Sequence, residues 1–119
     1  MKRDMDLFRE VLLYAESMEG QWFASKRVPE GCKRKKFVYH VGLAINAGFL
    51  RGRENHNLQG HDWLVIDLTY EGHEFLDSVR SSSIWDKVKG TAQKQGVELT
   101  VGVAMALAIE AAKQKLGLS

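Results

Sequence analysis

The sequence is poor in the residues that mark several specialised classes of protein. Its 119 residues include one cysteine, Cys32, and one proline, Pro29. A single cysteine excludes a disulfide scaffold and is typical of a reducing, cytosolic compartment. Charged residues open the chain with no apolar run behind them, so we expect no signal peptide. No apolar stretch reaches the roughly 20 residues that a transmembrane helix needs, so we expect a cytoplasmic protein without membrane contact.

Motifs of catalysis are also missing. The chain has no glycine-rich dinucleotide motif, no Walker loop and no H-E-x-x-H pattern. Its acids are scattered, so a pair of catalytic carboxylates has no local support. We therefore expect no enzymatic activity and no cofactor.

The composition is that of an ordinary soluble domain. Hydrophobic residues make up 45% and charged residues 27%, and the formal net charge is +2. This charge is too small to indicate a nucleic-acid partner by itself. Residues 20–60, however, hold eight basic side chains against two acids: Lys26, Arg27, Lys33, Arg34, Lys35, Lys36, Arg51 and Arg53. Such a stretch favours an anionic partner, or it is a solvated surface.

Periodicity predicts helices over 4–18, 33–47 and 69–80, a short helix from Ser83, and a last helix over 98–116. We expect an extended segment at 21–28, strands at 49–51 and 63–68, and a polar hairpin loop at 52–62. This order predicts an α+β, mostly helical single domain over 1–119. Its winged-helix-like core would cover 4–80 with a two-stranded wing, and a helical C-terminal extension would cover 83–117.

The last helix is apolar nearly all round between Leu99 and Ile109. Either it passes through the middle of the domain, or half of it is buried against a second copy. The second alternative predicts a homodimer with Leu99, Val103, Leu107 and Ala108 at the interface.

An ordered set of motifs resembles one known family. The chain opens with M-K-R-D-M-D-L, has E-G before its middle helix, Y-H within it and A-G-F-L at its end, and continues with L-T-Y-E-G-H-E-F-L-D. It resembles family 2513 of domains of unknown function, small proteins of bacteriophages, prophages and bacterial genomes. The resemblance implies a winged-helix-like core and no enzymatic activity. It assigns no function to the matching positions Tyr39, His40, Gly48, Thr69, Gly72 and His73.

Where relatives in that family are often acidic, this chain reads Lys33, Arg34, Lys35 and Lys36. In a winged helix these residues would open the recognition helix, with Arg51 and Arg53 at the start of the wing. We expect all six to contact phosphate, with Tyr39 and His40 nearest the bases.

The remaining outward positions of this helix are apolar: Val38, Gly42 and Leu43. They favour non-specific DNA contact, a protein partner, or coverage by the last helix. The leading hypothesis is a DNA-associated regulator of phage or prophage type. The alternative is a non-enzymatic accessory protein that binds and modulates a host protein.

A metal site is the last possibility that the sequence raises. Cys32, His40, His56 and His61 are the possible ligands, and the last two are spaced like the second half of a zinc finger. Because no paired cysteine completes that motif, we expect a polar loop and no bound metal.

Overall fold

A computed structural model describes residues 1–118 of the chain and has an α+β fold that is mostly helical, as the sequence predicted. The elements follow one another in the order α1 (Met5–Ser17), β1 (Trp22–Phe23), the 3₁₀ helix η1 (Ala24–Lys26), α2 (Arg34–Asn46), β2 (Leu50–Asn57), β3 (Gly60–Leu68), α3 (Tyr70–Val79), α4 (Ser82–Gln95) and α5 (Val101–Leu116). The chain divides into two compact units, Met1–His73 and Glu74–Ser119. None of the described helices is long and apolar enough to cross a membrane.

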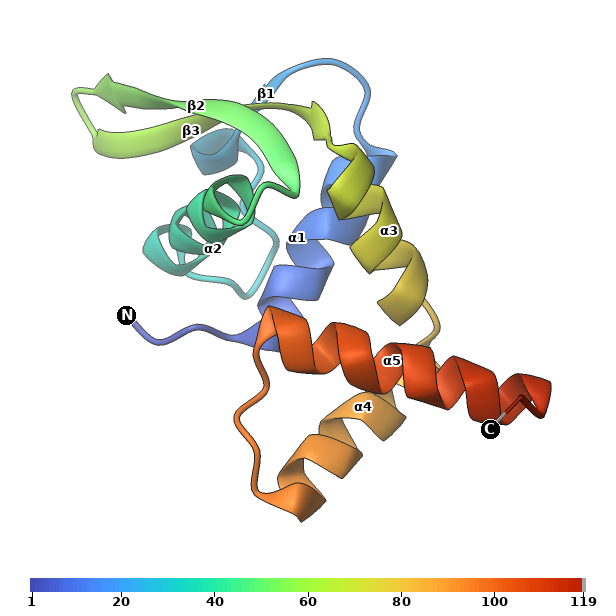
Figure 1. Cartoon of the computed structure of the whole chain (residues 1–119). Coiled ribbons are helices and arrows are strands. Elements are labelled where there is room, and N and C mark those ends of the chain that lie inside the picture. Colours follow the sequence, from blue (N-terminus) through green and yellow to red (C-terminus); the bar gives the residue numbers. More distant parts are fainter. Residues whose placement is uncertain (119) are drawn as a thin grey trace. The chain divides into compact units, whose positions relative to one another are not determined.

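The sheet of the first unit has three antiparallel strands in the order β1-β3-β2 (Figure 1). Trp22 pairs with Val65 and Phe23 with Leu64, so the extended segment near Trp22 joins the edge of the hairpin. A register shift between Arg51 and Gly52 interrupts the β2–β3 ladder once.

The prediction of a polar loop over 52–62 was wrong. The ladder continues to the pair Asn57–Gly60, so Leu58 and Gln59 alone form the turn. The Asn57 side chain accepts a hydrogen bond from the Gln59 amide at 2.8 Å, and Gly60 has a φ of 113°. Most side chains of this outer hairpin are exposed. They therefore lack the alternation of apolar and polar residues by which a half-buried strand is predicted.

The extended segment over 21–28 is shorter than predicted, because a 3₁₀ turn follows Phe23. Asp62 fixes this turn from the hairpin. Its buried carboxylate accepts hydrogen bonds from the Ser25 amide at 2.9 Å and the Ser25 hydroxyl at 2.5 Å. The partners are 37 residues apart, so no local pattern could predict the turn.

Side-chain caps set the ends of the helices. Thr69 caps α3 as predicted: its hydroxyl accepts from the Gly72 amide at 3.0 Å and donates to the Gly48 carbonyl at 2.5 Å. Ser81, and not Ser83, caps α4 through the Ile84 amide at 3.3 Å. Thr100 caps α5 through the Val103 amide, so this helix begins later than residue 98.

Each unit has its own buried apolar residues. In the first unit, Phe8 packs edge-on against Phe49 with ring centroids 6.0 Å apart, and Tyr14 packs against Trp22 at 5.5 Å. In the second unit α4 packs on α5. The buried side chains of this helix pair are Trp85, Val88, Ala92, Ala104, Ala108 and Ala111. Small alanines on α5 permit this close approach of the two helices.

Candidate functional site

The helix α2 has one solvent-exposed face, which carries Lys35, Tyr39 and Asn46. Its other faces are covered, including two positions that the sequence placed outward. Val38 is buried, and a Cβ on Gly42 would lie 2.6 Å from the indole nitrogen of Trp63. Two of the three expected apolar positions are therefore covered, and the third, Leu43, is half-buried. Tyr39, with 39% of its surface exposed, is the large apolar side chain that this helix leaves open.

The first four residues of the chain lie along α2. The backbone amide of Asp4 donates to Nε2 of His40 at 2.8 Å, and its carboxylate pairs with the Lys36 ammonium at 3.0 Å. Partial burial opposes ionisation of Asp4. Hydrogen bonds from Lys36 and from the Leu7 amide outweigh that effect and lower the pKa of this carboxyl. Lys2 and Arg3, which precede Asp4, are exposed.

A hollow of about 310 Å³ lies between the start of α2 and the tip of the hairpin. Its lining consists of Met1, Arg34, Lys35, Val38, Tyr39, Gln59, Gly60 and His61. One terminal nitrogen of the Arg34 guanidinium is buried and has no hydrogen-bond partner. A buried cationic donor without an acceptor is costly, and Arg34 is also one of the residues that line the hollow.

The charge at the start of α2 also favours the binding of an anion. The N-cap position is Lys33, which makes no side-chain capping bond, and the first turn contains no acid. Free amide groups and the helix dipole make this end positive, and Lys33, Arg34 and Lys35 add to it. Cations here oppose stability, whereas an anion at the same place would be bound favourably. We call Lys33, Arg34, Lys35, Tyr39 and the hollow beside them the α2 surface.

The predicted site residues do not all reach this surface. Arg53 lies between Gly52 and Glu54 on β2, and a Cβ on Gly52 would meet the Ile45 side chain of α2 at 2.8 Å. Because side chains alternate along a strand, Arg53 points to the opposite face. Arg51 is bound to Asp67 by two hydrogen bonds of 2.6 and 2.5 Å. This guanidinium lowers the pKa of Asp67, so the charge of Arg51 is already neutralised.

His40 was predicted to lie near the bases, and that prediction was wrong. It is fully buried, accepts the Asp4 amide at Nε2 and lies 2.8 Å from the Lys36 carbonyl at Nδ1. Both ring nitrogens are therefore used inside the protein. Lys36 was predicted to hold phosphate, but its ammonium already pairs with Asp4.

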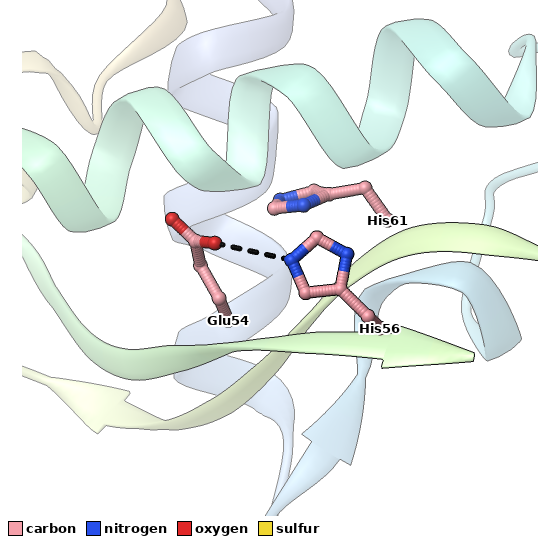
Figure 2. Close-up of side chains that lie close together, drawn as sticks. All are labelled: Glu54, His56 and His61. Carbon is pink, nitrogen blue, oxygen red and sulfur yellow. Dashed lines mark ion pairs between the residues drawn. The ribbon is translucent and has the colours of Figure 1, made fainter.

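A second group of polar side chains lies on the hairpin. Figure 2 shows Glu54, His56 and His61 on the side of the strands toward α2. His56 and His61 are direct cross-strand partners with ring centroids 4.9 Å apart. Nε2 of His56 is 3.4 Å from the Glu54 carboxylate. All three side chains are exposed.

The predicted dimer residues lie in and before α5. Ala108 is buried within the monomer, so its placement at a dimer interface was wrong. Leu107 is half-buried and lines a small hollow with Val88 and Thr91 of α4. Leu99 and Val103 are also half-buried. The large apolar side chains that α5 exposes are instead Ile109 and Leu116.

Sequence reasoning missed several residues of the α2 surface and its surroundings. Lys2 and Arg3 were outside the basic segment, and Gln59 and His61 lay in the supposed loop. The register of the hairpin, had it been predicted, would have placed Gln59 and His61 at its tip beside α2. Contact of residues 1–4 with α2 had no signal in the sequence, because it depends on the buried ring of His40.

Comparison with known proteins adds a family but no activity. Residues 2–98 match the family model described as "Hypothetical protein (DUF2513)". The chain is similar to an "Uncharacterized protein" of Haemophilus influenzae, with 29% identity over 104 residues that cover 85% of this chain and 86% of that protein. No solved structure matches the chain.

Proposed function

We propose that this chain, which belongs to the DUF2513 family, is a winged-helix-like protein that binds double-stranded DNA through its α2 surface. A regulatory role and the phage or prophage setting that the resemblance implies are parts of the same proposal. The observation that carries it is the start of α2, where three cations surround an uncapped helix end and one guanidinium nitrogen has no partner. Phosphate is the anion that such an end binds well.

The arrangement of elements supports this proposal. α2 is followed directly by the β2–β3 hairpin, and β1 closes the sheet in the order β1-β3-β2. In a winged helix the helix before the wing enters the major groove. The short 3₁₀ helix η1 is the helical element that directly precedes α2 in the chain. Only a few outward side chains, Lys35, Tyr39 and Asn46, could reach base edges, which favours weak sequence preference.

Titration of the protein into a labelled duplex, followed by fluorescence anisotropy at two salt concentrations, tests the proposal. We expect the affinity to fall with salt, with a log–log slope of about −0.9 for each phosphate contacted. The double variant Lys33→Ala/Lys35→Ala should bind more weakly on every sequence and reduce the magnitude of the slope by about 2.

Two controls make this test specific. Lys94→Ala/Lys113→Ala removes the same charge from exposed positions of the second unit and should keep the wild-type slope. Arg53→Ala should change the affinity less than twofold, since Arg53 points away from α2. Failure of the wild type to bind duplex DNA at low salt, or an equal loss in the two double variants, contradicts the proposal.

A second candidate function is the binding of a host protein, and the lining of the hollow favours it. Val38 and the half-exposed ring of Tyr39 give this hollow an apolar wall beside Arg34. An apolar wall with a cation next to it suits a partner that presents an apolar side chain close to a carboxylate. Absence of DNA binding together with saturable capture of one acidic protein partner, lost in Arg34→Ala, would favour this function.

A further inference from the structure

The hairpin holds three potential metal ligands: His56 and His61, which the sequence raised as possible ligands, and Glu54, which it did not. We call Glu54, His56 and His61 the hairpin cluster. Glu54 and His56 are two residues apart on β2 and so project from the same face of the strand. His61 stands opposite His56 on β3. The ladder therefore directs one carboxylate and two imidazoles to a common point (Figure 2).

The distances suit a single small cation. One ligand atom from each residue lies within 4.8 Å of the other two, and Nε2 of His56 is 3.4 Å from the Glu54 carboxylate. Ligands bound to zinc at about 2.0–2.2 Å in tetrahedral geometry are separated by roughly 3.4 Å. Rotamer changes of about 1 Å would close the remaining gap, with no movement of the strands needed.

Neighbouring side chains hold one of the ligands in place. The His61 ring packs edge-on against the ring of Trp63 at 5.1 Å, and Trp63 is itself buried against α2 at Gly42. Such support reduces the freedom that a ligand loses on binding a metal. The contact between His56 and Glu54 is exposed and contributes little to stability.

We propose that the hairpin cluster binds one divalent transition-metal ion, with zinc as the reference ion. Two imidazoles and one carboxylate are borderline ligands that suit Zn²⁺, Ni²⁺ and Co²⁺ better than Mg²⁺ or Ca²⁺. Because the site has three protein ligands and faces solvent, water or an outside ligand completes the coordination. His61 also lines the hollow beside Arg34, so a bound ion adds positive charge to the α2 surface. The inference stands on the cluster alone and does not require DNA binding.

Isothermal titration of the untagged, full-length protein with zinc chloride tests this site without DNA. We expect one ion per chain with micromolar affinity. His56→Ala and His61→Ala should each weaken binding at least tenfold, and Glu54→Gln should weaken it severalfold. The matched control is His73→Ala, which removes an exposed histidine outside the cluster and should bind zinc like the wild type.

A second measurement locates the ion. Substoichiometric Ni²⁺ should broaden the imidazole proton signals of His56 and His61 in an NMR spectrum, and those of His40 and His73 much less. All cluster residues are exposed, so circular dichroism should show that the variants keep the fold. The proposal is overturned if zinc gives no saturable heat, if the double variant His56→Ala/His61→Ala binds as tightly as the wild type, or if Cys32→Ser or His73→Ala abolishes binding.

Discussion

Two residues that the sequence could not pair, Asp4 and His40, join the start of the chain to α2. His40 was expected to face outward, yet it is buried because the Asp4 amide and the Lys36 carbonyl satisfy both of its ring nitrogens. A buried imidazole without such partners would be unfavourable. The partner amide is 36 residues away, so helical periodicity around His40 could not reveal it. Asp4, by contrast, was correctly placed at the start of its helix, because the helix dipole acts locally.

Replacing Asp4 by asparagine should separate its two roles. Asparagine still caps α1 through the Leu7 amide, where aspartate accepts at 3.2 Å, but it loses the charge that pairs with Lys36. The pKa of Asp4 is lower in the folded state than its ordinary value of 3.8. Its contribution to stability is therefore present above that ordinary value and is lost as the pH falls through the lower folded pKa.

We expect Asp4→Asn to lower the free energy of unfolding at pH 7 by a few tenths of a kcal/mol, because the pair is partly exposed. At pH 2 to 3 (about one unit below the ordinary value) the difference from the wild type should shrink. Urea unfolding at both pH values measures this. The control Glu30→Gln removes an exposed carboxylate and should leave the free energy of unfolding unchanged at either pH. If Asp4→Asn lowers the free energy of unfolding by the same amount at both pH values, the assignment is contradicted.

At the scale of elements, local signals predicted the helices and failed at the hairpin. The predicted ranges 4–18, 33–47 and 69–80 differ by one residue at each end from α1, α2 and α3, because caps and apolar stripes lie within these segments. The pairing of β2 with β3 beyond Arg51 depends on backbone hydrogen bonds and a two-residue turn. These backbone bonds do not require particular residue types at positions whose side chains project into solvent. The candidate site was therefore half predicted: the start of α2 was found, and the residues of the hairpin tip were not.

At Gly42 the helix α2 lies close to the Trp63 ring of the hairpin, and replacement of Gly42 by alanine tests that contact. A Cβ there would lie 2.6 Å from Nε1 and 2.8 Å from Cε2 of the Trp63 ring. Within a helix, glycine to alanine ordinarily stabilises by about 1 kcal/mol. Because Trp63 is buried and cannot move freely, we expect Gly42→Ala to destabilise the protein by about 1–3 kcal/mol.

Gly90 on α4 provides the matched control for this substitution. A Cβ at Gly90 would meet no atom within 4 Å, so Gly90→Ala should raise the free energy of unfolding by about 0.5–1 kcal/mol. Chemical denaturation of both variants gives the comparison. Equal stabilisation by the two substitutions would mean that the hairpin does not pack on α2 in solution.

At the scale of the whole molecule, charge is informative only where it is local. The net charge of +2 indicates no partner, and part of the basic segment is neutralised by acids from outside it, as in the pairs of Lys36 with Asp4 and Arg51 with Asp67. Of the remaining cations, Lys33, Arg34 and Lys35 lie together at the start of α2. Composition could suggest an anionic partner, but only the three-dimensional pairing shows which side chains are available for one.

The nearly all-apolar last helix led to the prediction of a homodimer, and the structure changes which residues of this helix could form the dimer interface. α5 packs on α4 with Ala104, Ala108 and Ala111 buried, and Leu107 is half-buried beside the same helix. Ile109 and Leu116, seven residues apart and hence on one helical face, are 47% and 71% exposed. A second copy packed against α5 would cover these two side chains. We propose that any homodimer forms through this face of α5.

Three glutamate variants distinguish loss of the dimer interface from loss of packing within the monomer. Ile109→Glu should shift the solution mass toward that of a monomer while the protein keeps its unfolding transition, since the buried charge of a dimer interface is costly only in the dimer. Leu107→Glu should instead lower the midpoint of unfolding, because the charge enters the packing of α5 on α4. Leu58→Glu, at the fully exposed tip of the hairpin, should change neither. Sedimentation equilibrium over a range of concentrations measures the mass. A wild type that stays monomeric at every concentration would contradict a homodimer formed through α5.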